Sequence, residues 1–396
     1  MTESLKSLLV HQAASVAFKP PDLDAIAHGN RRRVRRRRAV TVLAAAAAVA
    51  IVASAVVALS SLDNRRPDVV GPLPTGAVSW AMGSTIHNGP DTIEVGHTVR
   101  AYVRTTVGFV TVDEADNVYS VTDRGVQQIG RAAAVPKDGR EFVRLFSDPR
   151  GTLAGWVGTG PSEQTGLAML VHDQATGQTR TFEAGGSGGA VFFAIDDRTA
   201  YWRATPDRVV AVDVDTGDER QLAGADVAGN FAILSVENGV LAFSRNYQPF
   251  GNVTSLRVGR SIDAAREFTF GENAEADDAM RLSPSGAWLS YLWFQFDGPP
   301  QHDKVLAITA QVRDTGTGEL VSLNVPPGGL SVPIIWLDDT TLQVLAIGAV
   351  PGQVATQAHL YACRVPDGTC AVAVDLPAAA LDGNALVLPT GRSVSE

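Results

Sequence analysis

Hydrophobic and polar positions divide this chain into two unequal parts. One unbroken apolar run covers residues 39–62, and beyond it apolar residues occur in short runs separated by turn residues. From Ala39 to Ser60 the long run contains no charged residue, Pro or Gly. As a helix it would rise roughly 33 Å, at about 1.5 Å per residue, and a bilayer core is about 30 Å thick. Because a helix satisfies its own backbone in lipid, the pattern predicts one transmembrane helix at residues 39–62.

Seven arginines directly precede this run, and we interpret them as its topology anchor. Arginine beside a first membrane span keeps that side in the cytoplasm, so residues 1–38 are predicted inside the cell and the C-terminal part outside it. Contact with anionic lipid headgroups suits this position better than contact with nucleic acid. The seven residues are Arg31, Arg32, Arg33, Arg35, Arg36, Arg37 and Arg38.

Two other interpretations of the apolar run stay open. A cleaved signal peptide also has a basic start and an apolar centre, and Ala53-Ser-Ala55 resembles a cleavage site. The region before the run is long, however, and the run exceeds the apolar centre of about 7–15 residues that signal peptides have. The second alternative is a buried helix of a soluble protein, but such a helix beside seven arginines would have no polar face for water.

The first 38 residues carry a short helical pattern. An apolar stripe at helical spacing ends at Pro20-Pro21, and a second short pattern then continues into the arginines. Two such helices bury too little surface to be stable alone. They are predicted to fold on a cytosolic partner, with a disordered leader at the membrane surface as the alternative. The candidate docking residues are Leu5, Leu8, Leu9, Leu23 and Ile26.

After a proline-containing linker at residues 63–77, the chain repeats weakly. Each unit contains two tight turns, and the two series of turns have similar periods of roughly 46 and 49 residues. Such a period with four strands in each unit is the signature of a β-propeller. The first turns lie at residues 106–108, 148–151, 196–197, 238–239, 284–286 and 338–339. The later turns lie at residues 124–125, 176–177, 216–217, 263–264, 317–318 and 367–368.

The ends of this repeat region determine the number of blades. A partial unit with a turn at Asn88-Gly89 precedes the six full units, and a strand at residues 384–389 follows them. A closed ring leaves no strand edge unpaired, so this last strand is predicted to complete the first, partial unit. We therefore expect an all-β, seven-bladed propeller over residues 78–396, with six blades as the alternative.

The charge balance differs between the two parts. The chain has a net charge of −9, with +7 in residues 1–66 and −16 in the rest. An acidic outer domain repels DNA and anionic lipid, so we expect no nucleic-acid partner. The two cysteines, Cys363 and Cys370, flank a turn sequence and would face each other in a hairpin with a two-residue loop at Pro366-Asp367. We expect a disulfide between them, which suits an oxidising exterior.

The sequence offers little chemistry beyond binding. The outer histidines do not pair at metal-ligand spacing, and we predict no catalytic residue, no metal and no cofactor. Trp288, Tyr291 and Trp293 are expected mainly in the core. Long loops on a rigid ring commonly carry binding residues, and two such loops follow aromatic strands. The candidate ligand rim consists of Tyr247, Phe250, Phe294 and Phe296.

One stretch carries a resemblance to known repeats. The sequence Leu282-Ser-Pro-Ser-Gly-Ala-Trp-Leu-Ser-Tyr291 resembles the strand–turn–strand core of TolB-like and WD40-like propellers. The overall layout, with Pro20-Pro-Asp-Leu-Asp24 before the arginines, resembles actinobacterial single-pass membrane proteins found beside extracytoplasmic-function sigma factors. That resemblance implies anti-sigma-like or sensory regulation, with a sigma factor as a possible cytosolic partner.

These features predict a membrane-anchored, non-enzymatic binding or sensing protein. Its N-terminus would lie in the cytoplasm, and its extracytoplasmic propeller would bind an envelope ligand or protein. One alternative is an extracytoplasmic propeller hydrolase or lyase, which needs carboxylates or histidines that converge in the channel. Another is a passive scaffold of the cell envelope.

Overall fold

The structure is a computed structural model that describes most of the chain after residue 75. The predicted leader, the predicted membrane span and nearly all of the linker lie outside the described residues. Within the part that is described, no helix has the length and apolar character needed to cross a membrane. The described residues are 76–133, 135–137, 140–159, 167–183, 191–205, 208–223, 231–245, 253–270, 274–276, 280–296, 305–326, 329–348, 357–381 and 385–392.

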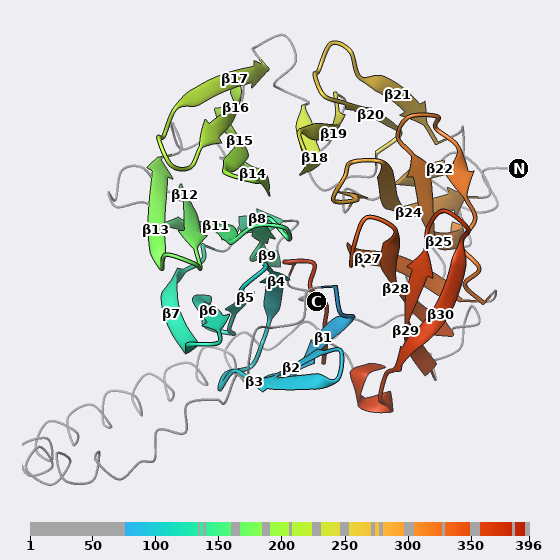
Figure 1. The fold of residues 1–396 in the computed structure, drawn as a ribbon, viewed down its shortest axis with the longest axis horizontal. Helices are drawn as coiled ribbons and strands as arrows, with labels where there is room; N and C mark the ends of the chain where they lie inside the picture. The colour runs from blue at the N-terminus through green and yellow to red at the C-terminus, as the bar shows by residue number, and fades with distance from the viewer. Residues whose placement is uncertain are drawn as a thin grey trace, which may run out of the picture. The chain divides into compact units, whose positions relative to one another are not determined.

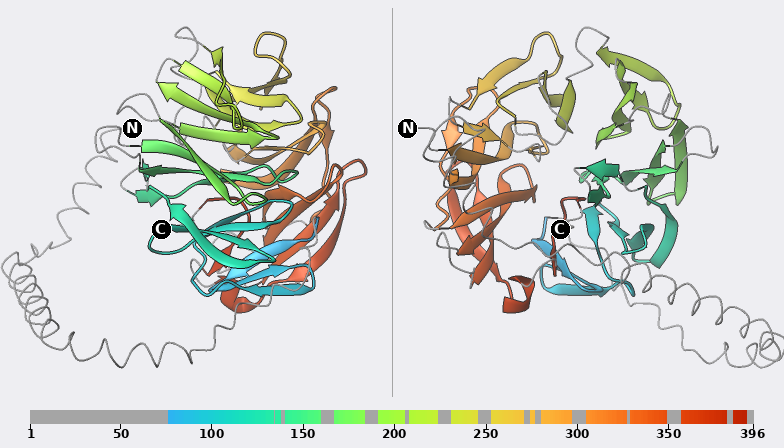
Figure 2. Two further views of the ribbon diagram at one scale, coloured as in Figure 1. Left: turned by 60° about the vertical axis from the view of Figure 1, so that its left-hand side comes forward. Right: turned by 180° about the vertical axis from the view of Figure 1, so that it is seen from behind.

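The described residues belong to one compact unit, Arg66–Glu396. They form seven antiparallel sheets of four or five strands, and each sheet is one blade of a ring (Figure 1). Views from the side and from behind show the blades packed around a common centre (Figure 2). The predicted all-β, seven-bladed propeller is confirmed, and the six-bladed alternative is wrong.

In blades 2–7 the strands follow chain order from the centre outward (Figure 1). Blade 2 consists of β4 (Ala101–Arg104), β5 (Gly108–Val112), β6 (Asn117–Thr122) and β7 (Gly125–Arg131). Blade 3 consists of β10 (Leu145–Ser147), β11 (Leu153–Thr159), β12 (Leu167–Asp173) and β13 (Gln178–Glu183). Blade 4 consists of β14 (Val191–Asp196), β15 (Thr199–Thr205), β16 (Arg208–Asp213) and β17 (Glu219–Ala223). Blade 5 consists of β18 (Ala232–Glu237), β19 (Val240–Ser244), β20 (Ser255–Gly259) and β21 (Arg266–Thr269). Blade 6 consists of β22 (Ala274–Ala276), β23 (Arg281–Leu282), β24 (Trp288–Phe296), β25 (Val305–Asp314) and β26 (Leu320–Val321). Blade 7 consists of β27 (Leu330–Trp336), β28 (Thr341–Gly348), β29 (Gln357–Arg364) and β30 (Thr369–Asp375).

Three features depart from a plain four-stranded repeat. In blade 6 the innermost position is shared, because β22 and β23 both pair with β24. Between blades 2 and 3 the chain forms a separate hairpin of β8 (Val135–Lys137) and β9 (Arg140–Phe142). A short 3-10 helix, η1 (Ala378–Leu381), follows blade 7.

Blade 1 closes the ring with strands from both ends of the propeller. Its outer strands are β1 (Ser79–Met82), β2 (Thr85–Asn88) and β3 (Asp91–Glu94), and its innermost strand is β31 (Leu386–Val387). β31 pairs antiparallel with β1 through Ala81↔Val387 and Met82↔Leu386. The predicted closure of the first blade by the C-terminal strand is therefore confirmed.

All twelve predicted turns of the six full units lie at connections between paired strands. The first series connects the innermost strand of blades 2–7 to the next strand, and the later series connects the third strand to the outermost one. Because neighbouring strands run in opposite directions, both series lie on the same face of the ring, which we call the turn face.

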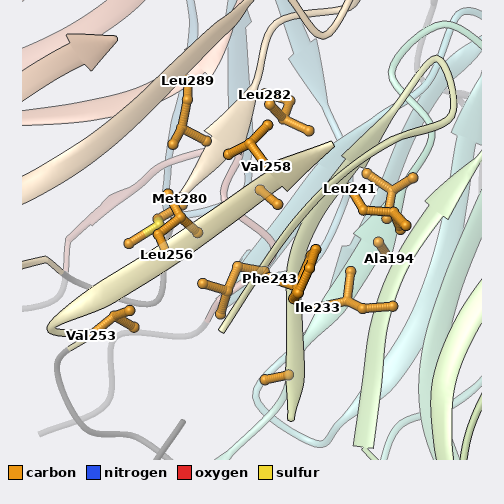
Figure 3. Packing of buried hydrophobic residues seen from close by; sticks show 14 of the residues in the cluster. Ala194, Ile233, Leu241, Phe243, Val253, Leu256, Val258, Met280, Leu282 and Leu289 are labelled. Atoms are coloured by element: carbon orange, nitrogen blue, oxygen red, sulfur yellow. The ribbon is translucent and has the colours of Figure 1, made fainter. Parts of the chain in front are cut away.

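The hydrophobic core is divided among the interfaces between neighbouring blades. Figure 3 shows the cluster that joins blades 4, 5 and 6, in which Ile233 and Phe243 pack near Ala194, and Leu282 and Leu289 belong to the next blade. Further clusters join the remaining pairs of neighbouring blades. Since a blade meets a neighbour on both faces, its strands are apolar on both sides; every residue of β5, for example, is buried.

The predicted disulfide between Cys363 and Cys370 is present, and it joins β29 to β30. The two residues are paired directly across the hairpin, as predicted. The turn itself is longer than expected, because the last pair is Arg364↔Thr369 and residues 365–368 form the loop. The longer turn leaves the pairing of Cys363 with Cys370 unchanged, so the disulfide covalently links the two outer strands of blade 7.

Breaking this bridge should have a modest effect on stability. A disulfide that closes so short a loop contributes roughly 2 kcal/mol through the entropy of the unfolded chain. Urea unfolding with and without reductant should therefore show a loss of about that size for the wild-type protein. The variant Cys370→Ser should unfold at one urea concentration under both conditions, and a wild type indifferent to reductant would contradict the prediction.

Candidate functional site

The last described residues of the chain lie in the central channel (Figure 1). Beyond β31 the chain reaches the innermost strands of blades 2 and 3. Gly391 donates its N–H to the carbonyl of Tyr102 at 2.9 Å, and its own carbonyl accepts from the N–H of Leu145 at 2.7 Å. From blade 6, Arg281 donates to the carbonyl of Thr390 at 2.9 Å. Three blades therefore hold this segment, residues 388–392, which we call the channel tail.

Gly391 suits its place in the channel tail. Its φ of 71° lies in the left-handed region that favours glycine. A Cβ at this position would overlap the carbonyl of Leu145 and would lie 2.8 Å from Cγ1 of Val103. The tail can pass between these two strands because residue 391 has no side chain.

A cavity of about 60 Å³ remains in the channel beside the tail. Innermost strands from blades 2–6 line it together with Thr390 and Arg392. This volume holds several water molecules, and it is far below the roughly 300–1,000 Å³ of pockets that bind drug-sized ligands. The described charged residues that line it are Arg144, Arg281, Arg392 and Glu237.

Strand alternation explains why Arg281 faces the channel. Met280 and Leu282, its neighbours in the chain, are buried in the cluster between blades 5 and 6 (Figure 3). Successive side chains of a strand point to opposite sides, so the residue between them points away from that cluster. Arg144 and Arg392 come from blade 3 and the channel tail, and they are paired in an antiparallel bridge.

The three arginines influence one another electrostatically. The pKa of Arg281 is lowered to about 10. Burial is the largest cause, and the positive charges of Arg392 and Arg144 also lower this pKa, while the negative charge of Glu237 raises it. The guanidinium of Arg144 also lies 4.9 Å from the centre of the Phe146 ring, a cation–π contact. Three of the four described charged residues that line the cavity are therefore arginines.

A group of buried carboxylates lies at the first turns of three consecutive blades. Asp148, Asp196 and Glu237 occupy these turns in blades 3, 4 and 5, and all three are buried. Arg150 connects them, with its Nη2 2.9 Å from Oδ1 of Asp196 and its Nε 3.4 Å from Oε2 of Glu237. Asp196 also accepts backbone N–H bonds from Asn238 at 3.0 Å and from the following residue at 2.8 Å.

The environment raises the pKa of two of these acids, Glu237 and Asp148. Burial raises the pKa of Glu237 well above its usual value, and the charges of Asp196 and Asp148 raise it further. Burial also raises the pKa of Asp148, against the backbone N–H and the charge of Arg150. A buried carboxyl whose pKa is raised in this way is chemically able to donate a proton.

The predicted ligand rim is only partly within the described residues. Tyr247 and Phe250 lie outside them, while Phe294 is half-buried and Phe296 is buried, both near the end of β24. Whether the four residues share one rim stays a prediction. The predicted docking residues in the leader and the arginines of the topology anchor also lie outside the described residues.

The aromatic residues of β24 pack as core residues, as expected. Tyr291 is fully buried in the cluster with blade 5, and Trp293 packs against the same cluster. Trp288, on the opposite side of the strand, packs against the cluster with blade 7. Among the residues that the structure describes, no three His, Cys, Asp or Glu side chains are placed to hold a metal ion.

The arginines around the cavity and the buried carboxylates were not predicted from the sequence. Asp148 and Asp196 were visible only as ordinary turn residues. A usable signal did exist, because Asp148, Asp196 and Glu237 stand at the same point of three consecutive repeats. In a ring, equivalent positions of consecutive units are neighbours, so these carboxyls had to lie close together.

Comparisons with known proteins concern the fold alone. No protein-family model and no curated protein sequence matches this chain. A TolB-type protein from Agrobacterium tumefaciens is 9% identical, with a TM-score of 0.37 over 76% of this chain and 88% of that protein. An oligogalacturonate lyase in complex with manganese is 13% identical, with a TM-score of 0.44 over 76% of this chain and 84% of the lyase. The tricorn protease is 14% identical, with a TM-score of 0.39 over 74% of this chain and 34% of the protease.

The class of this protein rests on its strand pairing and not on those similarities. Seven sheets in a ring, closed by a strand from the C-terminal end, define a seven-bladed β-propeller.

Proposed function

We propose that this chain is a membrane-anchored extracytoplasmic β-propeller that binds or senses a ligand without catalysis. Its cytosolic leader regulates a partner in an anti-sigma-like manner. The observation that carries the binding function is the channel tail, which leaves a cavity of only about 60 Å³. In this proposal a macromolecular partner binds to the faces of the ring, and the described cavity takes only a small group.

The anchoring part of the proposal rests on the sequence. The apolar run at residues 39–62 follows seven arginines, which favours a cytosolic N-terminus and an outer propeller. The disulfide between Cys363 and Cys370 fits the same orientation, because such bonds persist in oxidising compartments.

Purification of the full chain from its native membranes tests the regulatory part. We expect one cytosolic regulator, such as a sigma factor, to co-purify with the wild type. Changing Leu5, Leu9 and Leu23 together to Asp should reduce its recovery at least about tenfold, since charge replaces the apolar docking stripe. Mass spectrometry of the purified material measures the recovery.

A matched variant separates docking from a general effect of added charge. The triple change Ser7→Asp, Ala14→Asp and Ala25→Asp adds the same charge away from the apolar stripe and should leave recovery unchanged. Equal recovery from the wild type and both variants would refute a specific role for the leader.

Topology is measured separately with a membrane-impermeant thiol reagent. A cysteine at Thr92, which is exposed on β3, should be labelled in intact cells. A cysteine at Ser4 should be labelled only after the cells are opened. The reverse result would contradict the proposed orientation.

An extracytoplasmic hydrolase or lyase is the second candidate, and the buried carboxylates are the observation that favours it. Glu237, with its raised pKa, would act as a general acid beside Asp196. Loss of a measured hydrolytic or lyase activity in Glu237→Gln, with the fold retained, would favour this candidate. A passive scaffold would show neither a cytosolic partner nor a ligand.

A further inference from the structure

We propose that Asn238 is a modification site at which the chain deamidates spontaneously, and that Asp196 limits the rate of this reaction. The site lies on the turn face and is separate from the proposed binding and regulatory function. It does not depend on whether the leader has a cytosolic partner.

The chain contains two Asn-Gly pairs, and they lie in very different surroundings. Asn238 and Gly239 form the first turn of blade 5, and both residues are exposed. The other pair connects β2 to β3, where Asn88 is fully buried and Gly89 donates its N–H to the carbonyl of Val78 at 2.9 Å. Because deamidation needs a side chain that can rotate and water that can reach it, the exposed pair is the reactive one.

The reaction uses only groups of this turn and water. The backbone nitrogen of Gly239 loses its proton and attacks Cγ of the Asn238 side chain. A new bond from nitrogen to Cγ closes a succinimide ring, and the bond from Cγ to Nδ2 breaks, so that ammonia leaves with the proton. Water then opens the ring at either carbonyl and leaves an aspartate or an isoaspartate at position 238.

Asp196 of blade 4 is placed to slow this reaction. Its carboxylate accepts the N–H of Asn238 at 3.0 Å and the N–H of Gly239 at 2.8 Å. The attacking nitrogen is therefore held in a charge-assisted hydrogen bond, and the negative charge beside it opposes the loss of its proton. These contacts must open before the attack, so the rate depends on local opening of the turn.

Conversion of Asn238 weakens a junction between blades 4, 5 and 6. The Nδ2 of Asn238 donates to the carbonyl of Ser285 in blade 6 at 3.4 Å, and its backbone carbonyl accepts from Arg260 at 3.0 Å. A carboxylate at position 238 sets an acceptor against the carbonyl of Ser285 and a second negative charge beside Asp196. An isoaspartate also adds a methylene group to the backbone, which changes how the turn presents its N–H groups to Asp196.

Ageing of the purified full chain at mildly alkaline pH tests the site. Peptide mapping by mass spectrometry, with chromatographic separation of aspartate and isoaspartate peptides, measures both Asn-Gly pairs. We expect both products to accumulate at position 238 of the folded chain, while Asn88 stays unconverted. In denaturing urea both positions should convert, and Asn238 should convert at least about tenfold faster than in the folded chain. An Asn238 that converts only in urea, or an Asn88 that converts as fast as Asn238 in the folded chain, would overturn the assignment.

Two matched variants test the control by Asp196. Asp196→Asn should convert Asn238 about tenfold faster than the wild type, because the charge-assisted bonds to the two N–H groups are lost. Asp314→Asn is the control, since Asp314 accepts two backbone N–H groups in a turn of blade 6 and should leave the rate at position 238 unchanged. Equal rates in the wild type and both variants would refute the role of Asp196. So would equal rates for the folded and the urea-unfolded wild type, a comparison that needs no variant.

Substitutions at position 238 measure the structural consequence. Asn238→Asp, the direct product, should unfold at a lower urea concentration than the wild type. Asn238→Gly cannot deamidate and keeps the left-handed turn, so its unfolding midpoint should not change with ageing, whereas that of the wild type should fall toward Asn238→Asp. Equal midpoints for Asn238→Asp and the wild type would contradict the weakened junction.

Discussion

A chain that lacks residues 385–396 should lose roughly 5 kcal/mol of unfolding free energy. The deletion removes Leu386, Val387 and Leu388, which pack against the cores on either side of blade 1. Burial of each such side chain contributes about 1.5–3 kcal/mol, and each backbone hydrogen bond of the tail adds about 1 kcal/mol. The loss exceeds that of an ordinary truncation because β31 is the strand that closes the ring.

Urea unfolding of the full chain and of the truncated chain measures this effect. Deletion of residues 393–396 alone is the matched control, since it keeps β31 and the described contacts of the tail. The larger deletion should also expose the edge of β1 and cause association that is visible by size-exclusion chromatography. Equal unfolding midpoints for the two deletions would show that ring closure contributes little.

The turns could be predicted because they depend on local chemistry. At Asn238 and Gly239 the φ angles are 51° and 70°, the pair of left-handed residues that a tight hairpin turn requires. Asn-Gly is the sequence most typical of that turn, so residues 238–239 indicated a hairpin without any tertiary information. The same reasoning at the other turns gave the period, and the period gave the propeller.

Closure by the C-terminal strand could also be predicted, because a partial first unit and a surplus last strand are visible in the sequence. The position of the channel tail could not be predicted from the sequence. Residues 389–392 have no periodic pattern, and their contacts with Tyr102 and Leu145 exist only once the ring has brought blades 2 and 3 beside the last strand.

The candidate site depends on the same long-range geometry. Arg144, Arg281 and Arg392 are separated by more than a hundred residues from one to the next, and none belongs to a recognisable motif. Their proximity follows from three innermost segments that face one channel. A single sequence shows the repeat that creates this channel, but not which side chains of different repeats meet in it.

Replacing Arg150 by Met should destabilise the propeller by roughly 2–3 kcal/mol at pH 8 and by less at pH 5. Arg150 is the cation that joins Asp196 to Glu237, and its removal leaves buried carboxylates to repel one another. Breaking a fully buried ion pair costs about 3–5 kcal/mol, and we expect less because the Arg150 side chain is 38% exposed.

The pH dependence of this loss follows from the raised pKa values of Glu237 and Asp148. Above the unfolded-state pKa, the folded state keeps more protons on these acids than the unfolded state does, so stability falls as pH rises toward the folded-state values. Removing Arg150 raises both folded-state values further, and the fall becomes steeper. Urea unfolding at pH 5 and pH 8 measures it.

Two comparisons identify the carboxylates as the cause. Adding Glu237→Gln to Arg150→Met should recover part of the loss at pH 8 and flatten the pH dependence, since one of the repelling charges is removed. Arg257→Met, which breaks the exposed pair with Glu267, should cost no more than about 1 kcal/mol and should add no pH dependence over this range. A loss in Arg150→Met that is equal at both pH values would instead assign the effect to packing of the arginine stem. The buried acids at the turn face would then be held apart by their backbone hydrogen bonds and not by Arg150.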